Sequence, residues 1–388
     1  PCSSAASDVY KRQMYIIDSD GSNLKCITND LDQTPGAPFW SENSSGVYFN
    51  VREFGQSNVY YANLSGQISK VSQGNHMLTM NDLVGNNAVA TWTNPSNPSD
   101  IVSFSVKKFN KIDRLTDVNN DIFYNVEFGK VEEINYESVD GKIVQGWVVK
   151  PQQFDSKKKY PLVLRIHGGP HSMYNVGFNY NFQLHAAQDQ VVLYTNPRGS
   201  TGYGYDFANA IQNAYPGNDY DDIMAGVDEI ISRGYIDENK MYVYGGSGGG
   251  VLTSWIVGKT DRFAAASVNY PVTNWFSFVG TTDGAGWYYN FEKFPWEDPT
   301  EHIKRSPLMY VGNVKTPTML MCGEEDLRTP ISQTEEYYQA LKMNKVPTVM
   351  IRFNEEYHGT STKPSNFLRT HGYINAWFNK HSTKNKVE

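Results

Sequence analysis

The sequence is poor in basic residues, in cysteine and in long apolar runs. Its 34 Lys and Arg residues are outnumbered by 41 Asp and Glu residues, giving a formal charge of −7, and no basic block stands out. This balance argues against a nucleic-acid partner. No apolar run approaches the roughly 20 residues that span a bilayer, so no membrane partner is expected. Three cysteines are too few for a disulfide framework.

The sequence also lacks a recognisable metal-binding motif. No H-E-x-x-H pattern of a zinc peptidase occurs. His167 and His171 have the spacing of zinc ligands on one helix face, but the Gly-Gly-Pro between them does not hold a helix. We therefore expect no metal site and no cofactor.

The most informative stretch is a glycine-rich turn around one serine. An apolar run over 241–244 ends in Gly245-Gly246-Ser247-Gly248-Gly249, and an apolar segment over 251–257 follows. Strand, G-x-S-x-G and helix in this order are typical of a nucleophile elbow, which presents a serine hydroxyl at the end of a sheet. Ser247 is the candidate nucleophile, and a solvated glycine-rich loop is the alternative until further context is added.

Residues 129–388 carry the pattern of an α/β fold. Strand-like runs alternate with longer amphipathic segments, which predicts a largely parallel sheet with helices on both faces. The expected strands cover 132–138, 143–149, 162–167, 191–195, 241–244, 264–268, 318–322 and 348–353. The expected helices cover 218–233, 247–259, 332–343 and 366–381. About eight mostly parallel strands after an antiparallel start describe an α/β-hydrolase sheet.

A serine nucleophile needs a base to take its proton and an acid to orient that base. In an α/β-hydrolase these partners follow the serine in the order Asp/Glu, His, each on a loop after a strand. Asp326 follows the seventh strand and is the predicted acid, whereas Glu324 and Glu325 are expected to be solvated. His358 is the only one of the eight histidines on the loop after the last strand, and is the predicted base. The oxyanion hole is expected to use the amides of Gly248 and Gly169.

A repeat of 44 residues precedes residue 120. Ile27-Thr28-Asn29, Val71-Ser72-Gln73 and Leu115-Thr116-Asp117 each follow a strand-like run and a polar turn. A period in the forties with about four short strands per unit predicts β-propeller blades, with a β-sandwich as the alternative. Residues 14–128 are thus predicted to form a partial, truncated propeller of two to three blades, whose open strand edges favour a homo-oligomer.

Residues 1–13 look foreign to a natural protein. Asp8-Val9-Tyr10-Lys11-Arg12-Gln13 matches a translated end of a common sequencing transposon, so we expect an artefactual leader here. The natural start would then be missing together with any signal peptide. A soluble protein of the cytoplasm or of the periplasm is compatible with this sequence.

Together these residues resemble the prolyl oligopeptidase family of serine peptidases, in particular its acylaminoacyl-peptidase and dipeptidyl-peptidase-like branch. The motifs that carry the resemblance are His167-Gly-Gly-Pro-His171, Asn196-Pro-Arg-Gly-Ser-Thr-Gly-Tyr-Gly204, Gly245-Gly-Ser-Gly-Gly249, Thr260-Asp-Arg-Phe263, Glu325-Asp-Leu-Arg-Thr-Pro330 and His358-Gly-Thr-Ser361. The resemblance covers nearly all of residues 130–380 and extends to the repeats. It implies an α/β-hydrolase domain capped by a β-propeller that filters substrates by size, and it assigns Ser247, Asp326 and His358 the roles given above.

The resemblance also implies substrate contacts. Arg328 aligns with an arginine that in some members grips a substrate backbone carbonyl, and a structural salt bridge is the alternative. Val272, Trp275 and Phe278 would form an apolar wall of the primary specificity pocket, with ordinary core packing as the alternative. Gly248 departs from the family, because a tyrosine or another large residue usually follows the nucleophile.

The expected function is hydrolysis of short peptides through an acyl-enzyme. In this mechanism His358 takes the proton of Ser247 and later donates it to the leaving amine, while Asp326 holds the imidazole. An esterase or amidase acting on small acyl compounds is the runner-up, since fold does not fix substrate. A catalytically silent binding protein that uses the propeller surface is the alternative from a different class.

Overall fold

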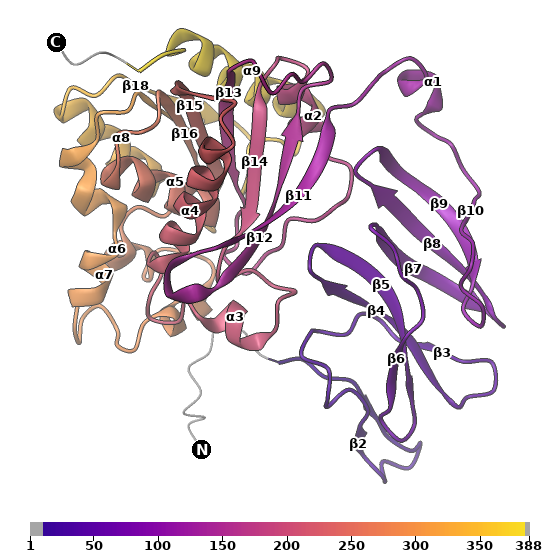
Figure 1. The fold of residues 1–388 in the computed structure, drawn as a ribbon. Helices are drawn as coiled ribbons and strands as arrows, with labels where there is room; N and C mark the ends of the chain where they lie inside the picture. The colour runs from indigo at the N-terminus through magenta and orange to yellow at the C-terminus, as the bar shows by residue number, and fades with distance from the viewer. Residues whose placement is uncertain (1–10, 385–388) are drawn as a thin grey trace.

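A mixed eight-stranded sheet forms the core of the larger, C-terminal part of the chain (Figure 1). The computed structural model describes residues 11–384, so most of the predicted leader lies outside the described residues. In spatial order the strands are β11 (Lys130–Glu137), β12 (Ile143–Lys150), β14 (Val191–Asn196), β13 (Tyr160–Ile166), β15 (Ile236–Gly246), β16 (Ala265–Asn269), β17 (Thr318–Gly323) and β18 (Thr348–Phe353). The pairs β11–β12 and β12–β14 are antiparallel and the remaining pairs are parallel, which confirms the predicted α/β-hydrolase sheet.

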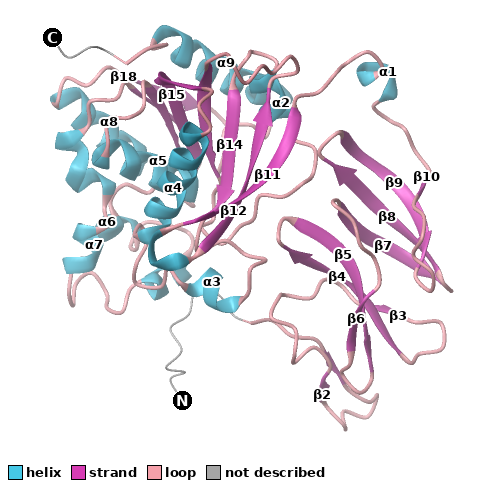
Figure 2. Ribbon diagram, viewed as in Figure 1, coloured by secondary structure: helices cyan, strands magenta, loops and turns pink. Residues whose placement is uncertain are grey.

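Helices cover both faces of this sheet (Figure 2). They are α2 (Tyr180–Ala186), α3 (Tyr205–Asn209), α4 (Asn218–Ser232), α5 (Gly248–Lys259), α6 (Trp275–Phe278), α7 (Thr300–Lys304), α8 (Ile331–Met343) and α9 (Pro364–Lys380). Helices α4, α5 and α8 pack into the core on one face, and α2 and α9 pack on the other. The long helices match the predicted segments, whereas α2, α3, α6 and α7, of 4 to 7 residues, are too short to show a helical period.

The N-terminal part is built from antiparallel meanders. Its strands are β1 (Tyr15–Ile16), β2 (Lys25–Cys26), β3 (Phe39–Trp40), β4 (Gly46–Glu53), β5 (Gln56–Asn63), β6 (Ile68–Lys70), β7 (Met77–Val84), β8 (Asn87–Asn94), β9 (Asn97–Ser105) and β10 (Asp113–Arg114). Strands β3 to β6 pair in sequence order, as do β7 to β10, and each set is one four-stranded unit. This is the blade arrangement that the repeat predicts. Helix α1 (Asn120–Phe123) lies in the connection to β11.

The repeated hydroxyl residues have one structural role. Thr28 Oγ1 accepts a hydrogen bond from the Met14 amide at 2.7 Å, and Ser72 Oγ accepts one from the Val59 amide at 2.8 Å. Thr116 Oγ1 does the same for the Ile101 amide at 2.9 Å. In every repeat, therefore, a hydroxyl accepts from an amide 13 to 15 residues earlier, which lies in a strand or directly before one. This shared bond explains why Ser and Thr alternate at the repeated position.

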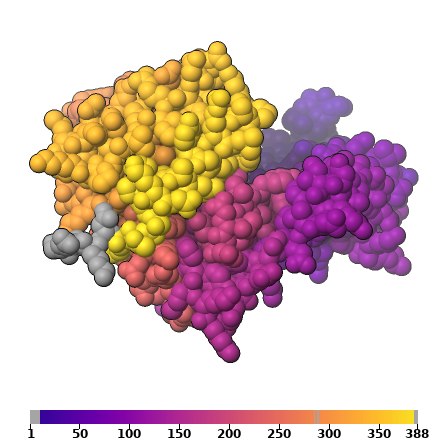
Figure 3. All heavy atoms as spheres, turned by 90° about the horizontal axis from the view of Figure 1, so that it is seen from above, coloured from indigo at the N-terminus to yellow at the C-terminus, as the bar shows by residue number. Residues whose placement is uncertain are grey.

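The two parts contact each other through backbone and apolar contacts. The Phe54 amide donates to Gly202 O at 3.1 Å, and the Val176 amide donates to Gly55 O at 2.9 Å. Met77 of the N-terminal part belongs to the same apolar cluster as Trp147 of the sheet. Seen from above in Figure 3, the N-terminal part forms one end of the molecule, away from the yellow C-terminal residues. Within residues 11–384, no helix has the length and apolar character needed to cross a membrane.

Buried histidines make stability pH-dependent. Burial lowers the pKa of His167, His185 and His371 to about 4 each, from about 6.5 in an unfolded chain. Between these values the unfolded chain binds more protons, so the free energy of unfolding decreases as the pH falls through this window. Burial raises the pKa of Asp219 to about 7 and also raises the pKa of Asp221, and these two groups act in the opposite direction. We expect a lower thermal midpoint at pH 4.5 than at pH 7. The difference between the two midpoints should be smaller in His185→Gln. An equal or higher midpoint at pH 4.5 would contradict this account.

Candidate active site

The candidate nucleophile lies at the turn between β15 and α5. Ser247 has φ +57° and ψ −122°, a conformation that a residue with a side chain keeps only when its surroundings impose it. A Cβ at Gly245 would lie 2.3 Å from Gly249 O, and one at Gly249 would lie 2.4 Å from Ile166 O. Only glycine fits at these two positions, and this close packing holds the turn that exposes the serine.

Three side chains from distant parts of the chain form one hydrogen-bonded series. His358 Nε2 lies 3.0 Å from Ser247 Oγ. His358 Nδ1 lies 2.9 Å from Asp326 Oδ2 and 3.1 Å from Oδ1. An ionised carboxylate only accepts hydrogen bonds, so Nδ1 carries the proton and Nε2 is left as acceptor for the serine hydroxyl. Asp326 and His358 follow β17 and β18, and both therefore lie at the carboxyl edge of the sheet.

The carboxylate and the imidazole loop are themselves held in place. Asp326 is buried and accepts hydrogen bonds from the Thr329 amide at 2.8 Å and from Thr329 Oγ1 at 3.0 Å. Glu356, two residues before His358, is fully buried and accepts from Asn366 Nδ2 at 2.7 Å. Glu324 and Glu325 are both exposed. Sequence reasoning missed Glu356, because a buried carboxylate that anchors a loop has no motif of its own.

The loop after β13 lies beside the serine. A Cβ at Gly248 would be 3.0 Å from the carbonyl carbon and oxygen of Gly169, so these two residues lie against each other. The same Cβ would lie 3.0 Å from Tyr215 Oη, which donates to Gly248 O at 2.8 Å. Tyr215 thus occupies space next to the position where a side chain after the nucleophile would begin. This contact gives a physical reason for glycine at position 248.

A narrow pocket opens beside Ser247. Val272, Trp275, Phe278 and Arg328 line it together with Ser247, Gly169 and Gly248. Sequence reasoning missed four further lining residues, Tyr215, Val251, Trp287 and Thr329. The free volume is about 10 Å³, about enough for one water molecule. A substrate side chain therefore enters only if the aromatic walls move apart.

Arg328 makes an ion pair at the rim of this pocket. Its Nε lies 2.6 Å from Asp283 Oδ1, and both side chains are about half exposed. Asp283 belongs to the segment that also carries Trp287. The salt-bridge alternative for Arg328 therefore has a partner in the structure, and the position in the pocket wall is compatible with a substrate contact as well.

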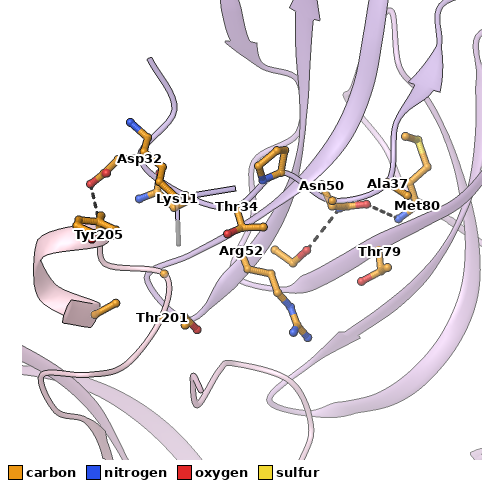
Figure 4. Close-up of a pocket in the computed structure, with 17 residues that line it drawn as sticks. Lys11, Asp32, Thr34, Ala37, Asn50, Arg52, Thr79, Met80, Thr201 and Tyr205 are labelled. Atoms are coloured by element: carbon orange, nitrogen blue, oxygen red, sulfur yellow. Dashed lines mark hydrogen bonds between the residues drawn. The ribbon is translucent and has the colours of Figure 1, made fainter. Parts of the chain in front are cut away.

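A larger cavity lies between the two parts of the chain (Figure 4). It has a volume of about 450 Å³ and is lined by β4, β7, the 32–37 loop and residues 201–208. Asp32 Oδ2 accepts a hydrogen bond from the Tyr205 amide at 3.2 Å across it. The 196–204 loop, which contributes to this lining, also contacts the candidate site, because Ser200 Oγ lies 3.0 Å from His167 Nε2. The 196–204 loop thus lines the cavity and also contacts the glycine loop beside Ser247.

Comparison with known proteins shows which family the chain is similar to. The model of the prolyl oligopeptidase family matches residues 176–385. The chain is 36% identical to the uncharacterized peptidase YuxL of Bacillus subtilis over 95% of this chain and 59% of the relative. It is 33% identical to acylamino-acid-releasing enzyme 1 of Oryza sativa over 58% of this chain and 30% of that protein. The acylaminoacyl peptidase of Pyrococcus horikoshii superposes with a TM-score of 0.87 at 25% identity.

These relatives are longer than the chain. The superposition on the Pyrococcus enzyme covers 97% of this chain and 60% of that one. The chain thus spans about three fifths of the length of this enzyme and of YuxL.

Proposed function

The chain belongs to the prolyl oligopeptidase family, and from this membership and the geometry at Ser247 we propose that it is a serine peptidase that hydrolyses short peptides through an acyl-enzyme. The observation that carries the proposal is the hydrogen-bonded series Ser247–His358–Asp326 at a strained turn. His358 takes the hydroxyl proton as the serine attacks the scissile carbonyl, and then donates it to the leaving amine. Asp326 holds the imidazole and stabilises its charged form.

The amides of Gly169 and Gly248 form the oxyanion hole in this proposal. They belong to adjacent residues beside Ser247, one on the loop after β13 and one on the first residue of α5. Backbone donors held in fixed positions stabilise the tetrahedral oxyanion without reorganising during the reaction. The mechanism requires no metal and no cofactor.

The proposed division of the chain is a propeller-like unit over 14–128 and a peptidase unit over 129–388. The connection with α1, between β10 and β11, supports this boundary. In this proposal the 450 Å³ cavity between the units accommodates the part of a peptide that extends away from the cleaved bond. Short peptides are the proposed substrates.

A panel of substrates tests the peptidase assignment. Val272, Trp275 and Phe278 are buried and apolar, so peptide anilides with an apolar side chain beside the cleaved bond should be hydrolysed best. We expect kcat/KM at least about 10-fold higher than for the same peptides with a charged side chain, because an unpaired charge in this pocket is desolvated. Hydrolysis of p-nitrophenyl esters alone would favour the esterase. No turnover and no labelling by a fluorophosphonate, in folded protein, would favour a binding protein.

Arg328 gives a second prediction. If its free Nη groups hold a substrate carbonyl in both the ground and the transition state, Arg328→Met raises KM about 5- to 10-fold and leaves kcat nearly unchanged. Asp283→Asn is the control, since it removes the ion pair and keeps the guanidinium. An equal rise in KM in both variants would assign Arg328 a structural role through the pair with Asp283.

A further inference from the structure

An arginine without an acidic partner lines the cavity between the two parts of the chain. Arg52, near the end of β4, belongs to the wall of this cavity of about 450 Å³, and its side chain is exposed. Among residues 11–384, no carboxylate forms an ion pair with its guanidinium. Figure 4 shows the side chain extending away from the strand. Since a guanidinium keeps its charge at every physiological pH and presents five N–H donors, the cavity contains a fixed positive charge that a ligand can reach.

The acidic residue next to Arg52 in the chain faces away from the cavity. Successive side chains of a strand point to opposite faces of the sheet, so Glu53 lies on the other face of β4. There it forms an ion pair with Lys70 at 2.8 Å. The strand thus presents its positive charge to the cavity, while its negative charge is neutralised elsewhere.

The other charged residues of the lining leave this charge uncompensated. Asp32 Oδ2 accepts a hydrogen bond from the Tyr205 amide at 3.2 Å, and Lys11 Nζ donates one to Asn29 O at 3.3 Å. In the described part of the chain, Asp32 forms no ion pair with Arg52 or with Lys11. The lining therefore carries two positive charges and one negative charge, and its net charge favours an anionic group.

The backbone at Arg52 packs against a loop that supports the candidate site. A Cβ at Gly202 would lie 3.4 Å from Arg52 O. The neighbouring Thr201 amide donates to Ser172 O at 2.9 Å. Ser172 follows Gly169 by three residues, so the Cα atoms of these two residues are at most about 11 Å apart. An extended peptide covers such a distance with about three to four residues.

We propose that Arg52 binds a carboxylate of the peptide substrate, about three to four residues from the cleaved bond, and makes the protein selective for peptides that carry one. This inference rests on the proposed peptidase function and adds a substrate feature to it. A carboxylate is planar and accepts two N–H groups of a guanidinium at once. Thr34, Thr79 and Thr201, from three different segments of the lining, supply hydroxyls that can donate to it as well. The carboxylate belongs either to the free C-terminus of the peptide or to an Asp or Glu side chain.

Binding to the Ser247→Ala protein, which leaves the peptide intact, tests the carboxylate. Three N-acetylated peptides share one sequence and one neutral fluorescent label. The first has a free C-terminus, the second has a C-terminal amide and a Glu four residues from an apolar side chain, and the third has the amide and a Gln in place of the Glu. Fluorescence anisotropy at low salt is expected to give a Kd about 3- to 5-fold lower for the first or the second peptide than for the third, because the pair is exposed. About 0.5 M sodium chloride should reduce this difference by screening.

The peptide that binds more tightly identifies the source of the carboxylate. A free C-terminus is the source if only the first peptide gains affinity, and a side chain is the source if only the second does. An equal Kd for all three peptides at low salt would overturn the proposal.

Variants assign the effect to Arg52. Arg52→Met should give all three peptides the same Kd, and Arg52→Lys should keep part of the difference because it keeps the charge. Arg369→Met is the control: it removes the same charge from an exposed position on α9, outside the cavity, and should keep the full difference. The difference persisting in full in Arg52→Met, at an unchanged thermal midpoint, would refute the role of this residue.

Turnover by the protein with Ser247 intact separates this inference from the proposed function. The preferred carboxylate peptide should have a lower KM than the neutral peptide at a similar kcat, since Arg52 holds the substrate equally in the ground and transition states. Binding that depends on Arg52 and the carboxylate, without turnover of any peptide, would refute the proposed function and keep the carboxylate site. Turnover of all three peptides with equal KM would keep the function and refute the site.

Discussion

Replacing Ser247 with alanine is expected to lower kcat for a peptide anilide by about 10⁶-fold. The hydroxyl is the atom that attacks the carbonyl in the proposed mechanism, and no other described hydroxyl is hydrogen-bonded to His358 Nε2. The remaining rate over water would come from the oxyanion donors and from substrate binding, neither of which depends on the hydroxyl. Alanine keeps the Cβ, so the strained turn and the fold should persist.

Two measurements accompany this variant. Labelling by a fluorophosphonate should disappear in Ser247→Ala and persist in Ser254→Ala, which removes a buried hydroxyl on the same helix that bonds only to Val251 O. His358→Ala should lose activity to a similar extent, since groups that act as a unit are not additive. Activity of more than about one per cent in Ser247→Ala, with the contaminating host peptidases excluded, would assign the nucleophile to another residue.

The elbow and the order of its partners could be predicted from the sequence because backbone geometry dictates them. Gly245 and Gly249 cannot carry a Cβ at this turn, so the requirement for a tight approach is visible as glycine in the sequence. Asp326 and His358 could be placed because a parallel sheet brings the ends of its strands to one edge. Their bonding distances needed the structure, since they depend on Thr329 and on the loop anchored by Glu356.

Other features of the site and the fold have no recognisable pattern in the sequence. Tyr215 reaches the pocket from a loop and Trp287 from the short 3-10 helix Ala285–Asn290, and neither segment is long enough for a period that links position to burial. Arg165 stands within an apolar run that predicts a buried strand, and the sequence alone does not reveal that its guanidinium carbon lies 4.4 Å from the centre of the Tyr244 ring. The 44-residue repeat was visible, but its cause, a hydroxyl that accepts from an amide 13 to 15 residues earlier, came only with the coordinates.

A buried ion pair supports the loop behind the candidate site. Asp222 of α4 is fully buried and accepts from the Arg198 amide at 2.8 Å, from Arg198 Nε at 2.9 Å and from Arg198 Nη2 at 2.7 Å. These hydrogen bonds, above all, raise the pKa of Arg198. Asp140, at the turn between β11 and β12, accepts from the other side of the same guanidinium at 3.0 and 3.1 Å, and it is about half exposed. One arginine thus has a buried and an exposed carboxylate partner.

Asp222→Asn is therefore expected to lower the free energy of unfolding by about 3–5 kcal/mol, because it removes the buried one of the two carboxylates that pair with the buried guanidinium. Asp140→Asn is the matched control: the same chemical change at the exposed partner should cost less than about 1 kcal/mol, and asparagine tolerates the φ of +63° there. Urea denaturation measures both. Activity should fall in Asp222→Asn as well, because the 196–204 loop contacts His167 through Ser200. An equal decrease in the free energy of unfolding in the two variants would mean that burial does not determine how strongly each carboxylate stabilises Arg198.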